Sequence, residues 1–172
     1  MSLPLTGSAR QAEQDFVWFL YGSSLDRESF LAWAREHGYL LPPFEKAFPS
    51  RLDDYRLGFD VASRYWNGAV GSLLPAPGSR VEGLALPMPG AARGLADHKE
   101  GAVSGLFRAC EVLVSPLAGG PKVAAVAYVA SPDRRCPEAE APSAAWLEAV
   151  LRGARAAGLT SGWIAELERL RR

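Results

Sequence analysis

The sequence has little of what several classes of protein require. Its 172 residues include two cysteines and two histidines, too few and too widely spaced for a disulfide framework or a structural zinc site. Lysine plus arginine and aspartate plus glutamate number 19 each, so no net field attracts nucleic acid or an anionic membrane. A charged ligand must therefore be bound by a local arrangement of groups.

Long apolar segments and a basic leader are also lacking. The apolar run Phe16–Tyr21 is far too short to span a bilayer, and we expect a cytoplasmic protein. With 48% hydrophobic and 22% charged residues, the composition is typical of a folded protein. The length suits one domain with a substantial core, so we expect a single domain over residues 1–172, with residues 1–14 flexible.

The apolar pattern predicts strands in the middle of the chain and helices on either side. A strand over 16–21 leads into a glycine turn and a helix that Asp26 caps and Gly38 ends. The proline-rich segment 37–54 is expected to be an ordered loop. Further strands are expected over 55–62, 68–74, 80–88, 106–115 and 122–131, with a turn over 75–79, and further helices over 90–101 and after caps at Ser143 and Ser161. This order predicts an α+β fold whose sheet is curled or closed as a barrel.

The turn after the first strand is a candidate anion site. Backbone N–H groups of a glycine-bearing turn at the start of a helix can together bind a negative group, and Gly22 allows a ligand to approach the backbone closely. The alternative is a plain strand-to-helix connection, which is common. The turn has neither the G-x-G-x-x-G fingerprint nor a phosphate-loop lysine, so it does not indicate nucleotide binding.

Other residues suggest chemistry less directly. Ser23 as a nucleophile would need a histidine, but the turn lacks the G-x-S-x-G pattern, and we expect His37 to be partly buried on a helix. The segment LADHKEG, residues 95–101, is either a solvated helix end or places Glu100 in a pocket as a general acid and base. Tyr128 interrupts a strand of small apolar residues and either fills the core or faces a ligand.

These segments, in this order, resemble the γ-glutamylcyclotransferase family, also called AIG2-like. FLYGSSL, residues 19–25, is similar to an apolar strand that ends in the family's Tyr-Gly-Ser-Asn-Leu signature, and LADHKEG is similar to its Asp-x-x-Glu-Gly segment. The middle of the chain, residues 55–86, and the late strand VAAVAYVAS, residues 123–131, also resemble the family, so that the likeness covers nearly the whole sequence.

The resemblance implies a mixed β-barrel with surrounding helices and a cavity beside the turn. It implies release of 5-oxoproline from a small-molecule γ-glutamyl amide, with Glu100 as the catalytic acid and base. Tyr21, Gly22, Ser23, Ser24 and Tyr128 are the implied substrate-binding residues. Because one amide replaces another, we expect no cofactor and no metal, and we expect neither a nucleic acid nor a membrane as partner. The oligomeric state stays open.

The sequence departs from the family pattern at three places. Ser24 stands where the family has asparagine, Phe107 stands where relatives often have tyrosine, and the segment 38–50 is longer than expected. These departures concern the substrate more than the reaction. Two alternatives also stay open, namely a non-catalytic small-molecule binding protein on the same fold, and a serine-type amidase that uses Ser23 with His98.

Overall fold

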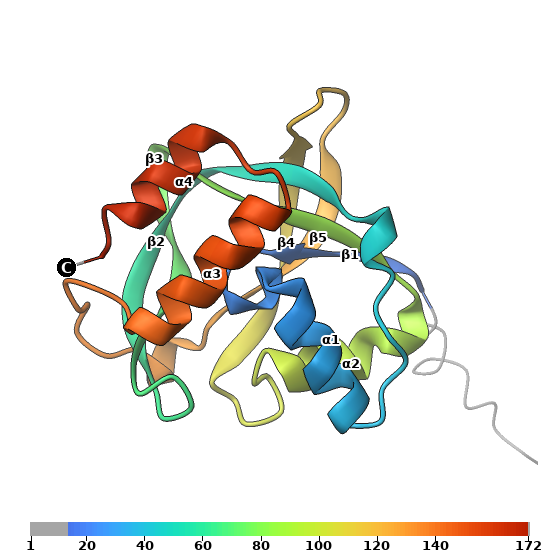
Figure 1. Ribbon diagram of the computed structural model, residues 1–172, viewed down its shortest axis with the longest axis horizontal. Coiled ribbons are helices and arrows are strands. Elements are labelled where there is room, and N and C mark those ends of the chain that lie inside the picture. The colour runs from blue at the N-terminus through green and yellow to red at the C-terminus, as the bar shows by residue number, and fades with distance from the viewer. Residues whose placement is uncertain (1–13, 172) are drawn as a thin grey trace, which may run out of the picture.

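Five strands close into a barrel in the order β1–β3–β2–β4–β5 (Figure 1). The computed structural model describes residues 14–171, so the expected flexibility of residues 1–14 concerns residues that, Gln14 excepted, lie outside this part. β1 pairs antiparallel with β3 and parallel with β5, which makes the barrel mixed and confirms the expected fold. The strands are β1 (Phe16–Leu20), β2 (Phe48–Ser63), β3 (Gly68–Met88), β4 (Phe107–Pro116) and β5 (Val123–Ala130).

The two long strands differ from the prediction. β2 begins at Phe48, inside the segment expected to be a loop, and β3 runs without a break through 75–79, where a turn was expected. The β2–β3 ladder shifts register between Asp53 and Tyr55 and again between Gly58 and Val61. Such irregularities let a strand bend sharply without ending. The prolines in residues 75–79, which suggested a turn, therefore lie at a bend of β3 beside the first register shift.

Within residues 14–171, four α-helices pack around the barrel (Figure 1). Ser143 caps α3, because its hydroxyl accepts a hydrogen bond from the Trp146 N–H at 3.3 Å, as expected. The cap of α4 is Thr160 rather than Ser161, since the Thr160 hydroxyl accepts from Trp163 N–H at 3.2 Å. The helices are α1 (Arg27–Glu36), α2 (Arg93–Lys99), α3 (Ala144–Ala156) and α4 (Ser161–Glu168), with short 3₁₀ turns η1 (Ser23–Leu25), η2 (Phe44–Lys46), η3 (Gly90–Ala92) and η4 (Pro132–Arg134).

The helix α3 holds the end of β1 in place. It packs directly on η1, the turn that follows β1, and its Gly153 lies against the Leu25 backbone. Asp26 occupies the N-cap position of α1, yet its carboxylate accepts hydrogen bonds from Ser29 and Arg152 rather than from the helix backbone. The turn is therefore fixed both by close packing and by an ion pair between α1 and α3.

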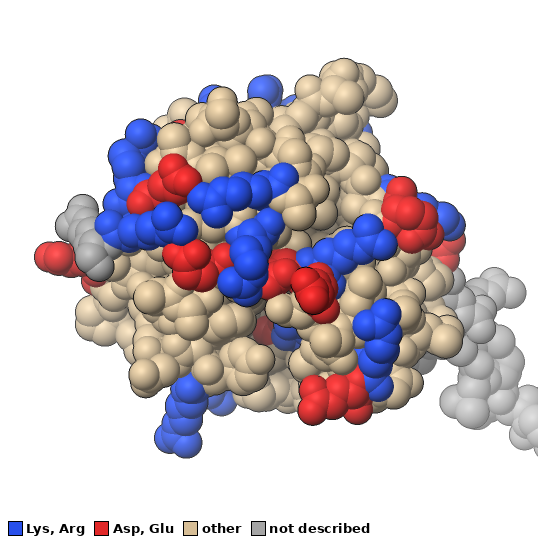
Figure 2. Space-filling view, viewed as in Figure 1, with Lys and Arg blue, Asp and Glu red and all other residues tan. Residues whose placement is uncertain are grey.

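The surface over α1 and α3 carries acidic and basic side chains interspersed, as expected for a chain without net charge (Figure 2). A hollow opens on this face beside the two helices (Figure 2). Across residues 14–171, no helix combines the length and the apolar character that crossing a membrane requires.

Candidate active site

A cavity of about 290 Å³ lies beside the turn at the end of β1. Its wall is built from segments far apart in the sequence: the end of β1, η1, α1, the β2–β3 turn, the end of α2, β5 and α3. Of the residues predicted for the site, all six line it, namely Tyr21, Gly22, Ser23, Ser24, Glu100 and Tyr128. The fold thus brings together residues that are more than one hundred positions apart.

Among the described residues, the turn that lines the cavity has backbone N–H groups without a partner. The carbonyls of Gly22 and Ser23 accept hydrogen bonds from Leu25 N–H and Asp26 N–H. In residues 14–171, the N–H groups of Gly22, Ser23 and Ser24 have no acceptor. Gly22 has a φ of −108°, so its left-handed freedom is not used. A Cβ at Gly22 would lie 3.4 Å from the Trp146 ring, which is an ordinary van der Waals distance, so a methyl group fits at this position.

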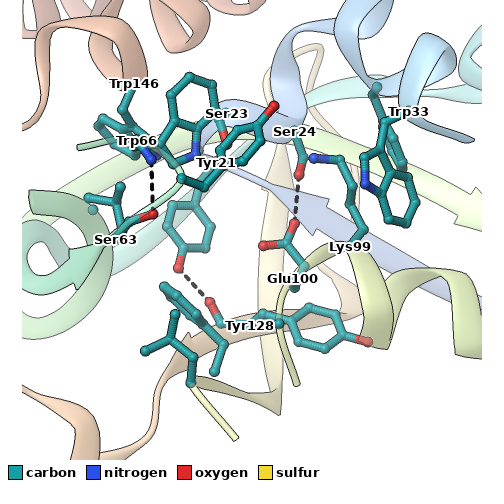
Figure 3. A pocket seen from close by; sticks show the side chains of 18 of the residues that line it. Tyr21, Ser23, Ser24, Trp33, Ser63, Trp66, Lys99, Glu100, Tyr128 and Trp146 are labelled. Carbon is teal, nitrogen blue, oxygen red and sulfur yellow. Dashed lines mark hydrogen bonds between the residues drawn. The ribbon is translucent and has the colours of Figure 1, made fainter. Parts of the chain in front are cut away.

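Glu100 directs its carboxylate toward this turn (Figure 3). It is the C-cap residue of α2, and Gly101, with a φ of +74°, ends the helix in the left-handed conformation that suits glycine. The Ser24 hydroxyl donates a hydrogen bond to Glu100 Oε1 at 2.7 Å (Figure 3). Burial raises the pKa of Glu100, while the charge of Lys99 and the Ser24 hydrogen bond oppose that rise.

The two tyrosines of the predicted site use their hydroxyls within the protein. The Tyr21 hydroxyl donates to the carbonyl of Tyr128 (Figure 3), and the Tyr128 hydroxyl donates to Asp97 Oδ1 at 2.6 Å. Burial raises the pKa of both phenols, so both stay protonated and both remain donors. These residues line the cavity mainly with their rings, and a substrate contact through Tyr128 remains a prediction.

Lys99 also belongs to the cavity wall, which the sequence did not indicate. Its ammonium lies 5.5 Å from the centre of the Phe30 ring and 5.3 Å from that of Trp33, distances at which a cation is attracted to an aromatic face. Burial lowers the pKa of Lys99, while the charges of Glu100 and Asp26 oppose the shift. The available signal was the helical spacing of Phe30 and Trp33, which placed both rings on one face of α1.

The two histidines lie outside the cavity wall. His37 is exposed and stacks on Trp33, with ring centres 4.4 Å apart, so the expectation of partial burial was wrong. His98 is exposed as well, and its Nδ1 lies 2.9 Å from the Tyr39 hydroxyl. The described residues that line the cavity thus include Ser23 but no histidine. Nor do residues 14–171 hold any group of three or more metal-ligating side chains.

Comparison with known proteins agrees with this architecture. A model of the AIG2-like family matches residues 80–167. The structure is similar to one called gamma-glutamyl cyclotransferase, with a TM-score of 0.74 and 24% identity over 92% of this chain and 89% of that one. It is similar to YkqA from Bacillus subtilis, with a TM-score of 0.77 and 21% identity over 94% of this chain and 55% of that one.

A third similar structure is a yeast gamma glutamyl cyclotransferase specific to glutathione, with a TM-score of 0.61 and 10% identity over 91% of this chain and 95% of that one. At these identities the structural likeness establishes the fold. No curated protein sequence matches the chain significantly. The family model covers slightly more than half of the residues. The chain therefore belongs to the AIG2-like family.

Proposed function

We propose that this protein is a γ-glutamylcyclotransferase-type enzyme that releases 5-oxoproline from a γ-glutamyl amide. The observation that carries the proposal is the position of Glu100. Among the described residues of the cavity wall it is the one with a carboxylate, and it lies opposite a turn whose N–H groups are unpaired. The site thus combines a proton acceptor with donors for a negative group.

The chemistry requires little beyond these groups. The α-ammonium of the substrate loses a proton to Glu100, and the resulting amine attacks the γ-carbonyl carbon of the same molecule. The carbon–nitrogen bond to the leaving group then breaks as Glu100 returns the proton to the departing nitrogen. The ring nitrogen still carries two hydrogens and gives one of them, through Glu100, to the leaving amine. The products are 5-oxoproline and the leaving amine as an ammonium. The nucleophile and the carbonyl belong to one molecule, so holding the substrate in the conformation for attack supplies much of the rate acceleration. Well-oriented intramolecular reactions reach effective molarities of about 10⁵–10⁸ M.

The hydrogen bond from Ser24 suits Glu100 to this role. It engages Oε1 at 2.7 Å, and Oε2 has no partner among the described residues. One oxygen therefore orients the carboxylate, and the other is available for the proton. The turn amides would bind the α-carboxylate of the γ-glutamyl group, because it is the negative group that all γ-glutamyl substrates share.

The test is an assay for 5-oxoproline with a panel of γ-glutamyl amino acids and amines, for the wild type and the Glu100→Gln variant. A positioned acid and base contributes about 10²–10⁴-fold, so we expect the variant to lose at least about 100-fold in kcat. Glu111→Gln is the matched control, since Glu111 is exposed on β4 and does not line the cavity. Undiminished turnover by Glu100→Gln would refute the mechanism.

The same assay separates the two alternatives. A serine amidase would release glutamate rather than 5-oxoproline, and Ser23→Ala would abolish its activity. We expect Ser23→Ala to retain most of the 5-oxoproline formation, because the turn acts through its backbone. A binding protein would take up γ-glutamyl compounds without forming either product.

A further inference from the structure

We infer that Lys99 binds a carboxylate on the leaving group, so that the protein selects γ-glutamyl amino acids over γ-glutamyl amines. This inference rests on the proposed function and concerns the same cavity. It begins from the fact that Lys99 is the one lysine or arginine among the described residues of the cavity wall.

The Lys99 ammonium is held in place without being neutralised by a direct contact. Within residues 14–171 it has no carboxylate within 4 Å and no hydrogen-bond acceptor. The Phe30 and Trp33 rings attract it at 5.5 and 5.3 Å, but rings of this kind leave the three N–H donors of an ammonium available. A partly buried ammonium with free donors is a site for an anion, because such a charge is stable only when it is paired.

Lys99 stands on a different side of Glu100 from the residues around Tyr21. In Figure 3 its side chain runs between the Trp33 ring and the hydrogen bond that joins Ser24 to Glu100. Tyr21 and Trp146 lie on the other side of that hydrogen bond (Figure 3). Trp33 in turn contacts the exposed rings of His37 and His98. The Lys99 side of the cavity therefore lies next to rings at the protein surface, and we place the leaving group on this side.

The number of anion-binding elements indicates the class of substrate. The cavity has two, which are the unpaired turn amides and the Lys99 ammonium. A γ-glutamyl amino acid carries two carboxylates, one on the γ-glutamyl group and one on the leaving amino acid, whereas a γ-glutamyl amine carries one. When Glu100 accepts the proton from the substrate, its negative charge is lost and Lys99 keeps its positive charge. A carboxylate beside Lys99 is thus bound most strongly as the ring begins to close.

The experiment compares two substrates, γ-glutamyl-alanine and γ-glutamyl-alaninamide. Their leaving groups have nearly the same size, but alanine carries a carboxylate and alaninamide carries a neutral amide. Hydrogen bonds between charged groups stabilise a complex more than hydrogen bonds between neutral groups do. We therefore expect the wild type to favour the carboxylate substrate by about 10- to 100-fold in kcat/KM. Lys99→Met should remove that preference by slowing γ-glutamyl-alanine by the larger factor, while γ-glutamyl-alaninamide slows only as far as loss of the Lys99 charge raises the pKa of Glu100. Lys99→Arg should retain part of the preference.

The ratio of the two rates is the readout, because partial misfolding and any change at Glu100 affect both substrates alike. Lys122→Met is the matched control, since Lys122 is exposed between β4 and β5, and it should keep the wild-type ratio. Equal slowing of both substrates by Lys99→Met, or a wild type without preference, would overturn the inference alone. If the wild type forms 5-oxoproline from neither substrate nor from the rest of the γ-glutamyl panel, the proposed function fails and this inference with it.

Discussion

Gly153 is the point at which α3 touches the turn that lines the cavity. A Cβ added there would lie 2.3 Å from the backbone carbon of Leu25 and 2.5 Å from its carbonyl oxygen. Backbone atoms cannot rotate away as the end of a side chain can. Gly153→Ala must therefore push α3 and η1 apart, and with them the N–H groups that face the cavity.

Two opposing effects set the size of the loss in stability. Alanine is favoured over glycine inside a helix by about 1 kcal/mol, whereas overpacking a buried contact costs about 1–3 kcal/mol. Since the clash is with backbone, the cost lies in the upper part of that range, and the free energy of unfolding should fall by about 1–2 kcal/mol. For a protein of this size that lowers Tm by about 2–8 °C.

The measurement is denaturant or thermal unfolding of Gly153→Ala beside Gly94→Ala. Gly94 lies in α2, and a Cβ there would meet nothing within 4 Å, so this control should be as stable as the wild type or slightly more stable. Gly153→Ala should also lower kcat/KM, because the turn is displaced. A Gly153→Ala protein as stable as the control would refute the idea that this contact fixes the turn.

Two further predictions concern the hydrogen bonds around the cavity. Ser24→Ala removes a hydrogen bond that lowers the pKa of Glu100, so this pKa should rise. Because the ionised carboxylate is the form that accepts the proton, the acidic limb of the plot of kcat/KM against pH should move to higher pH. An acidic limb that does not move would contradict this role of Ser24. Tyr21→Phe removes the hydroxyl that donates to the carbonyl of Tyr128. We expect the free energy of unfolding to fall by about 1–2 kcal/mol, and kcat for 5-oxoproline formation to fall less than tenfold. A stable but inactive variant would show that the hydroxyl serves the reaction.

Local sequence patterns predicted the elements around the site because short-range chemistry determines them. The apolar run before Gly22 forms β1, the alternation in residues 106–115 forms β4, and Gly38, with a φ of +73°, ends α1. The continuity of β3 could not be read in this way. The β2–β3 ladder pairs Pro75 with Tyr55 and Arg80 with Asp53, and residues 76–79 lie at a register shift without a ladder partner on β2. The strand continues across this irregularity because distant segments pair on both sides of it, and such pairing leaves no local mark in the sequence.

The same distinction applies within the site. Glu100 and the turn were named from short motifs, whereas the roles of their neighbours depend on contacts across the barrel. Ser24 was named as a substrate-binding residue, and no sequence pattern indicated that it donates to a carboxylate 76 positions away. Nor did the sequence indicate that the Tyr21 hydroxyl donates to the backbone of β5. Hydrogen bonds of this kind cannot be predicted from local sequence, because the closed barrel brings together residues that are far apart in the chain.

The surroundings of Glu100 give a physical role to Ser24, at which the sequence departs from the pattern that the resemblance implies. A proton-transfer group works best when its pKa lies near the working pH. Burial raises the pKa of Glu100 and so favours its protonated form, which cannot take the proton from the substrate. The Ser24 hydroxyl and the Lys99 charge both oppose that effect. A hydroxyl at position 24 can donate one short bond to Oε1 and occupies little space, so it lowers the pKa of Glu100 and orients the carboxylate while Oε2 remains open to the substrate.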